Sequence, residues 1–523
     1  MRPLKWLLSF GIFSAVTIGS SLALWGCGGG GGGGAAPTYS VSGTITGLTS
    51  SGLTLQLNGG NDLVVPANAM SFAFASMLGA GQNYAVTVSA QPSSPAQFCS
   101  VSNGSGTIGS ASVTTVAITC ATPQNVANIT IDSFNGNSAG NTAYITIKVC
   151  APGTNNCATI DHVSVDTGSF GLRLLSSAIN TYNATLLSAL PNVLTTGSLL
   201  AECGQFGSGY TWGSVRSVDF SVPNTNETVS GLPVQIVGDM EPAPSTCITQ
   251  SVTGQMLGPN GYTSAANFGA NGIIGVGPFP QDCEACSQTA MPTSNGTSYL
   301  VYTTCTSTTS STCTASTATL AQQVINPVSD FTVDNTGVII SLPAESGVGT
   351  ATASGTLTFG IVAGNSANNA LGNAKVYLAD PLSANVTTVY KSTTDTASFI
   401  DSGSNGLYFI DNSITACSAP AAGFYCPGGN TSPFNAGGSS TLTESATFED
   451  YQGNNGTMVN FTIENLNLVT GWASSGLAGT GTANQFDWGM PFFFGRTVYT
   501  ALTSQPFAAA NVIGGNTAPF YAF

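Results

Sequence analysis

The sequence predicts an all-β protein, in which a small β-sandwich precedes a larger β domain of two lobes. Apolar and polar residues alternate with period two in many short runs, as they do in half-buried strands. Clusters of Gly, Asn, Ser and Thr separate these runs, and long helical periodicity is scarce. Hydrophobic residues make up 42% of the 523 residues and charged residues only 6%. The chain therefore has apolar material for more than one core and a mostly neutral polar surface.

Charge and histidine content exclude several classes of function. Asp and Glu number 23 against 8 Lys and Arg, which gives a net charge of −15. A surface this acidic repels phosphate backbones, so we expect no nucleic-acid partner. The single histidine, His162, excludes metal sites built on several imidazoles and argues against a Ser-His-Asp triad. We expect neither a metal nor an organic cofactor, and we expect a structural role for His162.

Residues 1–27 have the features of a secretory signal. Arg2 and Lys5 precede an apolar stretch that ends in the tetrapeptide LWGC at Cys27, and a glycine-rich tether follows at residues 28–36. The stretch resembles a bacterial lipoprotein signal peptide, although it has Trp where a small residue is usual. The resemblance implies a lipidated Cys27 and a bacterial cell-envelope location, with the outer membrane favoured because Gly follows the cysteine. An uncleaved membrane anchor is the alternative, which the Gly and Ser within the apolar stretch disfavour.

The remaining cysteines indicate disulfides. Thirteen cysteines minus Cys27 leave twelve, and an even number in an exported chain favours disulfide pairing. The sequence does not fix the pairs, but short gaps between most consecutive cysteines favour pairing between neighbours. Cys283 and Cys286 form a C-x-x-C sequence, which is also typical of redox and metal sites. The sequence has no second such pair and no histidine nearby, so a tight loop disulfide is the favoured interpretation.

Residues 37–121 are expected to form the small sandwich, which we expect to be immunoglobulin-like. Four of its runs alternate with period two: Tyr39–Thr46, Leu53–Leu57, Tyr84–Val88 and Val113–Thr119. Turn-forming clusters separate the runs at the spacing expected of a sandwich. A disulfide between Cys99 and Cys120 would fix the last strands. Because the segment holds no reactive constellation, we interpret it as a spacer or a binding module.

Residues 125–523 are expected to form the larger domain. This length of β structure exceeds what one sheet core accommodates, which suggests a first lobe over about 125–315 and a second over about 316–523. Long helical periodicity is scarce here, and Ala318–Ile325 offers at most a short helix. The run Thr303–Thr319 is predicted to be a disulfide-clipped surface loop where the lobes join.

An acidic loop occurs twice in the larger domain. Each copy follows an apolar strand, reads D-[TS]-G-S, and continues as x-G-L into another apolar strand. In such a turn, backbone N–H groups and hydroxyls can bond the carboxylate and fix its orientation. The two copies are Asp166, Thr167, Gly168 and Ser169, and Asp401, Ser402, Gly403 and Ser404.

A pseudo-twofold arrangement of these loops would bring Asp166 and Asp401 face to face. Like charges that close cannot both ionise, so the pair would share one proton and titrate as a unit. The ionised member would take a proton from a water that attacks a carbonyl carbon, while the other protonates the carbonyl oxygen. This chemistry requires no metal.

The region resembles the bilobal, pepsin-like aspartic peptidases, in a bacterial lipoprotein branch of uncharacterised function. Gly272–Gly277 and Trp488–Arg496 match the family's strands that cross under the catalytic loops, and Gly355–Gly360 resembles a strand pair before the second loop. The resemblance implies a catalytic dyad of Asp166 and Asp401, an extended peptide substrate between the lobes, and a monomer. It also implies a flap hairpin, formed by Phe206, Gly207, Ser208, Gly209 and Tyr210.

Four residues depart from the family's pattern. Phe206 stands where the flap usually has Tyr, and Tyr210 substitutes only if the hairpin shifts. Arg173 occupies a position where Trp is common, and Asp487 one where an apolar residue is expected. Ser402 replaces Thr but keeps the hydroxyl. These departures leave the fold assignment intact and argue against efficient proteolysis.

Alternative interpretations remain open at the level of sequence. In the first alternative, the two aspartates are unrelated residues that cap turns. In the second, the pepsin-like fold is present, but its cleft only binds a peptide, glycan or protein partner. A third alternative is an adhesin or structural protein whose β domains present surface. Asp487 is expected to cap a turn, with a place near the cleft as the alternative, and Asp219 and Asp239 are expected to be solvated turn or edge residues.

Overall fold

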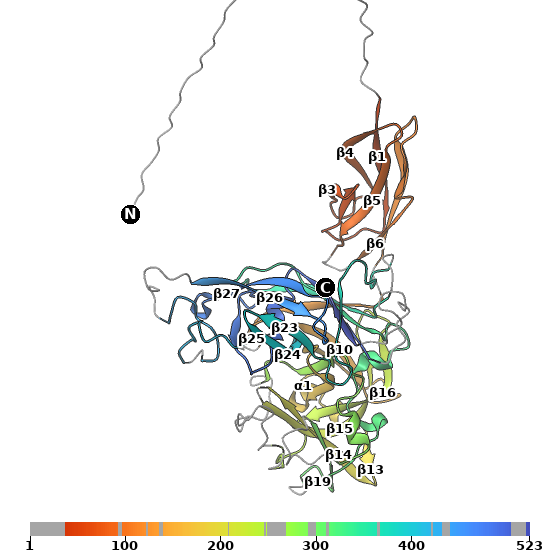
Figure 1. Ribbon diagram of the computed structural model, residues 1–523. Coiled ribbons are helices and arrows are strands. Elements are labelled where there is room, and N and C mark those ends of the chain that lie inside the picture. Colours follow the sequence, from red (N-terminus) through yellow and green to blue (C-terminus); the bar gives the residue numbers. More distant parts are fainter. Residues whose placement is uncertain are drawn as a thin grey trace, which may run out of the picture.

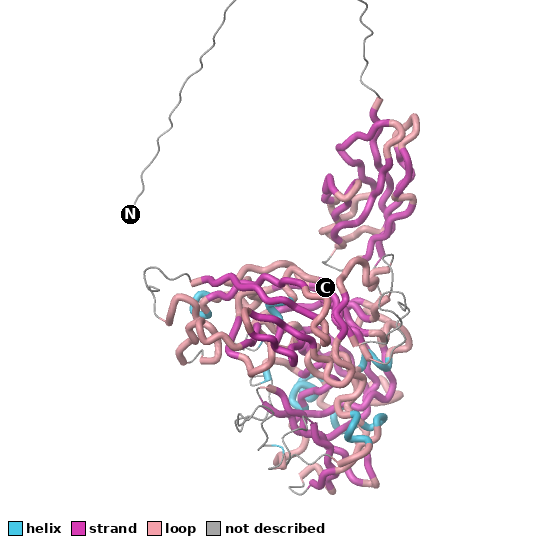
Figure 2. The backbone as a smooth tube through the Cα atoms, viewed as in Figure 1, coloured by secondary structure: helices cyan, strands magenta, loops and turns pink. Residues whose placement is uncertain are grey.

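The computed structural model describes most of the chain after the glycine-rich tether. The described residues are 37–92, 97–121, 124–134, 140–207, 209–244, 247, 268–290, 300–309, 313–362, 367–419, 422–430, 440–503 and 519–523. The predicted signal with Cys27, the tether and Ser208 lie outside these residues. Strands dominate the described part and helices are short (Figure 2), which confirms the all-β prediction. No helix among the described residues is long and apolar enough to cross a membrane.

The N-terminal unit is a sandwich of two four-stranded sheets (Figure 1), ordered β4-β1-β8-β6 and β3-β2-β5-β7. The period-two runs explain it, because alternate side chains such as Val41, Leu55 and Ile118 are fully buried between the sheets. The strands are β1 Thr38–Thr46, β2 Thr54–Leu57, β3 Gly60–Val64, β4 Ser71–Gly79, β5 Asn83–Ala90, β6 Phe98–Ser102, β7 Ser105–Thr107 and β8 Val113–Ala121.

A second, long sheet carries the first half of the larger domain. Its order begins β19-β18-β14-β15-β16-β12-β17-β11-β10-β9, with two short helices, α1 Ser176–Tyr182 and α2 Leu186–Ala189, alongside. The strands are β9 Val126–Ile131, β10 Tyr144–Cys150, β11 Cys157–Asp166, β12 Phe170–Leu175, β13 Leu194–Thr195, β14 Ser198–Phe206, β15 Gly209–Ser221, β16 Thr228–Val237, β17 Gly272–Val276, β18 Leu300–Cys305 and β19 Cys313–Ala315.

The same sheet continues into the second half through the antiparallel pairing of β9 with β21. Its further strands are β21 Ala353–Phe359, β20 Gly337–Ser341, β30 Thr497–Ala501, β31 Phe520–Ala522 and β22 Val376–Leu378. A separate sheet of the second lobe has the order β27-β26-β23-β24-β29-β25-β28. Its strands are β23 Val386–Tyr390, β24 Thr393–Ile400, β25 Leu407–Phe409, β26 Thr441–Glu449, β27 Thr457–Glu464, β28 Ala478–Thr480 and β29 Asp487–Trp488.

One local expectation differs from the structure. The segment 355–360 is not a strand pair. It belongs to β21, one strand held between β9 and β20. The segment 318–325, where we expect at most a short helix, forms a single 3₁₀ turn over Leu320–Gln322.

Each of the twelve cysteines pairs with its neighbour in the sequence, as predicted. The pairs are Cys99–Cys120, Cys150–Cys157, Cys203–Cys247, Cys283–Cys286, Cys305–Cys313 and Cys417–Cys426. Several of them join facing residues of adjacent strands, so they reinforce pairings that the sheet already makes.

The two lobes repeat one strand motif, which accounts for the repeated sequence. In the first lobe β17 runs parallel to β11 and antiparallel to β12, and β12 also pairs in parallel with β16. In the second lobe β29 runs parallel to β24 and antiparallel to β25, and β25 pairs in parallel with β28. Each acidic loop therefore connects two strands that flank a central crossing strand.

Candidate active site

The two acidic loops meet at the junction of the repeated motifs. Asp166 ends β11 and Asp401 directly follows β24, so both carboxylates stand at a strand end. A methyl group on Gly168 would lie 2.5 Å from the carboxyl carbon of Asp401, and one on Gly403 would lie 2.6 Å from that of Asp166. Only glycine fits at these positions, because each loop packs against the carboxyl group of the other. The two carboxyl groups therefore face each other.

Each carboxylate is held by its own loop in the same way. The Gly168 N–H donates to Oδ1 of Asp166 at 2.8 Å, and the Ser169 hydroxyl donates to Oδ2 at 2.5 Å. In the second loop the Gly403 N–H donates to Oδ1 of Asp401 at 2.7 Å. The Ser404 hydroxyl donates to Oδ2 of Asp401 at 2.8 Å. Two donors to one carboxylate fix its plane and stabilise its ionised form.

Thr167 and Ser402 hold the opposite loop rather than their own. The Thr167 N–H donates to Oγ of Ser402 at 3.1 Å, and the Ser402 N–H donates to Oγ1 of Thr167 at 2.9 Å. The Thr167 hydroxyl donates to the carbonyl of Ile400 at 3.0 Å, and the Ser402 hydroxyl to that of Val165 at 2.8 Å. Both side chains are buried. These crossed bonds fix the separation of the two aspartates.

Burial and a neighbouring charge act on the Asp166 carboxyl. Asp166 is buried, and burial is the main cause that raises the pKa of its carboxyl well above the ordinary range. The charge of Asp401 and a hydrogen bond with its carboxyl raise the pKa further, against the donors Ser169 and Gly168. These causes favour the protonated form of Asp166. A carboxyl that favours its proton, facing a second carboxyl, suits general acid–base catalysis.

A family model described as "Protein of unknown function (DUF3443)" matches residues 121–523. The chain belongs to this family. The DUF3443 region covers both lobes and both acidic loops. One solved structure similar to the chain is a crystal structure of aspartic proteinase from Irpex lacteus, with 16% sequence identity and a TM-score of 0.37. The similarity covers 72% of this chain and 93% of that one. No curated protein sequence matches the chain.

The hairpin of β14 and β15 in this DUF3443 protein contains the predicted flap residues. Phe206 pairs with Gly209 at its tip, and Gly207 is exposed in the turn. Tyr210 is buried and packs with Trp212 in a small cluster that includes the Cys203–Cys247 disulfide. Tyr210 does not lie at the tip. The role of the hairpin as a flap stays a prediction.

Arg173 forms a buried charge cluster that the sequence did not reveal. Its Nη2 donates to Glu202 at 2.5 Å and to Asp282 at 3.1 Å, and the Tyr302 hydroxyl donates to Asp282 at 2.7 Å. Burial and then the charge of Glu202 raise the pKa of Asp282, while Arg173 opposes this. Because Glu202 lies in β14, the cluster anchors the hairpin to β12, the strand after the first acidic loop.

Asp487 and Asp239 correct two expectations. Asp487 does not cap a turn: it is buried in β29, where its pKa is raised by burial first and then by the charge of Asp401. Asp239 is not solvated, because its side chain is buried and accepts a bond of 2.9 Å from Nη2 of Arg216. An acid within an apolar run, as in the FDWG sequence at Asp487, is the signal that could have found such a site.

His162 and Asp219 have structural roles, as expected. The His162 ring stacks on Phe134 with centroids 4.4 Å apart and contacts Asp161 at 3.0 Å. Asp219 accepts hydrogen bonds from the exposed backbone N–H groups of Gly153 and Gly231 at a sheet edge. Among the described residues, no three His, Cys, Asp or Glu side chains are grouped so as to hold a metal ion.

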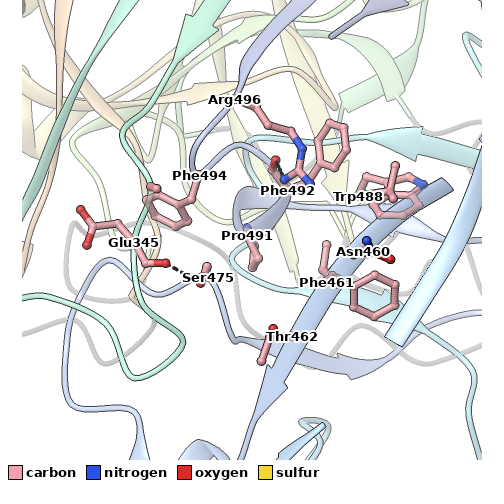
Figure 3. Close-up of a pocket in the computed structure, with 13 residues that line it drawn as sticks. Glu345, Asn460, Phe461, Thr462, Ser475, Trp488, Pro491, Phe492, Phe494 and Arg496 are labelled. Carbon is pink, nitrogen blue, oxygen red and sulfur yellow. Dashed lines mark hydrogen bonds between the residues drawn. The ribbon is translucent and has the colours of Figure 1, made fainter. Parts of the chain in front are cut away.

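A pocket of about 170 Å³ lies beside the second crossing strand (Figure 3). Trp488, Pro491, Phe492 and Arg496 are among its lining residues, and neither aspartate of the pair lines it. The Arg496 guanidinium covers the Phe492 ring at 4.8 Å and donates to the Phe492 carbonyl at 2.7 Å. This pocket is therefore distinct from the facing aspartates.

Proposed function

We propose that the protein is an aspartic endopeptidase, in which Asp166 and Asp401 activate water to hydrolyse peptide bonds. The main observation behind this proposal is that the glycine of each loop contacts the carboxyl of the opposite loop, which requires the two carboxyls to face each other. The crossed bonds of Thr167 and Ser402 support the proposal because they hold this geometry from both sides. Like carboxyls in contact share a proton, as this chemistry requires.

The proposed mechanism uses both carboxyls and one water. The ionised carboxyl of the pair takes a proton from the water as the water oxygen attacks the peptide carbonyl carbon, and the protonated carboxyl gives its proton to the carbonyl oxygen. In the tetrahedral intermediate, the first carboxyl returns its proton to the amide nitrogen and the C–N bond breaks. The second carboxyl then recovers the proton from the hydroxyl as the new carboxylic acid forms. The pair ends with one shared proton, as it began.

Substrate and location follow from the same proposal. The substrate is an extended peptide or protein segment, held by strand-like backbone hydrogen bonds with the hairpin at Phe206 as a flap. The protein acts as a monomer in the bacterial cell envelope, anchored in the outer membrane through lipidated Cys27. Removal of Cys27 would release it from membranes without changing the pair of aspartates.

A second candidate function is a catalytically idle surface lipoprotein that binds a peptide, glycan or protein partner. Phe206 favours this candidate, because Phe lacks the hydroxyl that a Tyr normally supplies in the flap of pepsin-like aspartic peptidases. An adhesin or structural protein is the third candidate. Cleavage assays separate these from the peptidase.

The test is acid-dependent cleavage of an unfolded protein by the purified chain. We expect cleavage that a statine-type inhibitor blocks and that Asp166→Asn and Asp401→Asn each reduce by about 10³-fold or more. Asp219→Asn is the matched control and should retain full activity, since Asp219 only bonds backbone at a sheet edge. Wild-type protein that cleaves nothing between pH 3 and pH 7, or cleavage that survives both substitutions, would reject the peptidase.

A further inference from the structure

Three residues on one face of β14 lie against the Arg173 guanidinium. Residues two apart on a strand share a face, so Glu202, Gly204 and Phe206 form one row along β14. Nη2 of Arg173 donates to Glu202 at 2.5 Å, and Cζ of Arg173 lies 5.7 Å from the centre of the Phe206 ring. Phe206 is the last residue of β14, so this row extends from the buried charge cluster to the tip of the hairpin.

Gly204 leaves room for the guanidinium between the acid and the ring. A methyl group on Gly204 would lie 3.1 Å from Nε of Arg173 and 2.6 Å from Oγ1 of Thr211. It would also lie 3.6 Å from Cε2 of the Phe206 ring. The first two distances are too short for well-packed atoms, so a side chain here would push its neighbours aside. The E-x-G-x-F sequence of β14 therefore forms a slot that the guanidinium fills.

The guanidinium itself is fixed beside the first acidic loop. Its Nη1 donates at 2.7 Å to the carbonyl of Phe170, the first residue after that loop. Nη2 also donates to Asp282 at 3.1 Å, and Arg173 is only 1% exposed. A planar guanidinium that is bonded to a carbonyl and two carboxylates has little freedom to rotate. Its position therefore sets the place where the Phe206 ring makes contact.

The contact between Arg173 and Phe206 is a cation–π interaction. Such a contact is favourable within about 6 Å of the ring centre, and more so where water is excluded. Here the guanidinium is buried and the ring is partly buried. Arg173 and Phe206 are also two of the four residues that depart from the pattern of pepsin-like aspartic peptidases, and they contact each other. The contact holds the hairpin tip without a hydroxyl group.

We propose that Arg173 is a positioning residue for the tip of the β14–β15 hairpin, where it holds the Phe206 ring at a fixed place relative to the first acidic loop. The proposal rests on the proposed peptidase function, in which this hairpin is the flap over an extended peptide. Glu202 and Gly204 shape the slot that Arg173 fills. One side chain thus links the loop that orients Asp166 to the hairpin that contacts the substrate.

Amide hydrogen exchange at the hairpin tip tests the proposal without turnover. Phe206→Leu keeps an apolar side chain but removes the ring. We therefore expect the amide of Gly209, which pairs with residue 206, to exchange about five- to tenfold faster than in the wild-type protein. Phe206→Tyr keeps the aromatic face and should keep the wild-type rate within about twofold. Phe220→Leu is the matched control, because it removes a buried ring at the other end of β15, and it should leave the Gly209 rate unchanged.

A second substitution tests whether Arg173 is the partner of the ring. In an Arg173→Met background, Phe206→Leu should produce no further acceleration, because the ring has already lost its cation. Gly204→Ala obstructs the slot and keeps the charged side chains, so it provides the same test if Arg173→Met is too unstable to purify. Equal acceleration by Phe206→Leu with and without these substitutions would overturn the role of Arg173.

In an active enzyme, Phe206→Leu should affect KM more than kcat. A hairpin tip without its fixed place binds the peptide less well, whereas Asp166 and Asp401 keep the donors of their own loops. We expect KM to rise about five- to tenfold and kcat to change by less than about twofold. A fall confined to kcat would contradict a positioning role in substrate binding.

The exchange experiment separates this proposal from the peptidase proposal. An unchanged Gly209 rate in Phe206→Leu rejects the positioning role, even in a chain that cleaves peptides. Faster exchange in a chain that cleaves nothing supports the positioning of the tip by Arg173 and rejects only the peptidase.

Discussion

Thr167 and Ser402 each satisfy polar backbone groups that belong to the other loop. Thr167→Val removes Oγ1 and leaves the Ser402 N–H and the Ile400 carbonyl without a partner in a buried site. Unsatisfied buried groups of this kind cost about 1–3 kcal/mol each. We therefore expect Thr167→Val to lower the free energy of unfolding by about 2 kcal/mol or more, measured by urea denaturation.

The control for this substitution is Thr181→Val. Thr181 is exposed and donates within α1 to the Ser177 carbonyl, so its loss should change the free energy of unfolding by only about 0.5 kcal/mol. Equal effects at Thr167 and Thr181 would mean that the crossed hydrogen bonds contribute nothing special to stability.

At the level of single residues, the sequence predicted which side chains assemble but not how each one acts. The repeated D-[TS]-G-S sequence located both carboxylates and their serine donors, since those bonds are local. That Thr167 and Ser402 bond the opposite loop depends on contacts 235 residues apart. The ion-pair partners of Arg173 could not be predicted either, because Asp282 lies 109 residues away in the sequence.

At the level of elements, the Arg173 cluster joins β12 to β14 and predicts two different mutational outcomes. Arg173→Met leaves two buried carboxyls without their cation, and breaking a buried ion pair in this way costs about 3–5 kcal/mol. Asp282→Asn should cost less, because the raised pKa of Asp282 means that a neutral side chain already suits its site.

Urea denaturation of both variants at pH 7 checks this difference. We expect the midpoint of Asp282→Asn to lie close to that of the wild-type protein and that of Arg173→Met to lie far below it. A larger loss for Asp282→Asn than for Arg173→Met would show that Asp282 is ionised in the folded protein.

The elements that the sequence predicted best are those with local signals. Period-two runs located β1, β2, β5 and β8, and the repeated loop located the strands on both sides of each aspartate. The expected strand pair at 355–360 was wrong, because the pairing of β21 with β9 is set by residues more than 220 positions away in the chain. Periodicity carries no information about such partners.

At the level of the whole molecule, buried acids make stability depend on pH. Burial is the largest cause that raises the pKa of several carboxyls, and it brings that of Glu227 to about 7. The folded protein therefore binds more protons than the unfolded chain between about pH 4 and pH 7, so the free energy of unfolding falls as pH rises through this range. The other raised carboxyls are Asp166, Asp282, Asp330, Asp334, Asp395 and Asp487.

Three carboxyls have lowered pKa values, so they make the free energy of unfolding fall as the pH falls, in a lower pH range. Hydrogen bonds lower the pKa of Asp161, Asp380 and Asp411, that of Asp411 to about 2, so their contribution is lost only when the pH falls below about 4. We expect maximum stability near pH 4 to 5 and a progressive loss of stability from there to pH 8. Thermal unfolding across pH measures this.

Glu227→Gln provides the matched test of the pH dependence. A neutral amide removes the proton that Glu227 keeps in the folded state, so the slope of stability between pH 5 and pH 7 should become shallower. A wild-type protein that gains stability from pH 5 to pH 8 would contradict the assignment of raised pKa values to these buried carboxyls.

Sequence reasoning also captured the outline of the molecule. Composition and turn spacing predicted an all-β chain with a sandwich ahead of two lobes, because those features depend on counts and local order. The continuation of one sheet from the first half into the second was not predicted, since it depends on which strand edges meet after folding. The residue boundaries of the domains stay predictions.

The neighbour pairing of the cysteines determines what holds the two halves of the larger domain to each other. All its disulfides close loops within one half, such as Cys305–Cys313 in the first and Cys417–Cys426 in the second. A single backbone nick between Cys313 and Gly337, ahead of β20, would therefore leave two fragments with no covalent link. They would migrate together on a native gel, held by β9 against β21, and separate in detergent without any reducing agent.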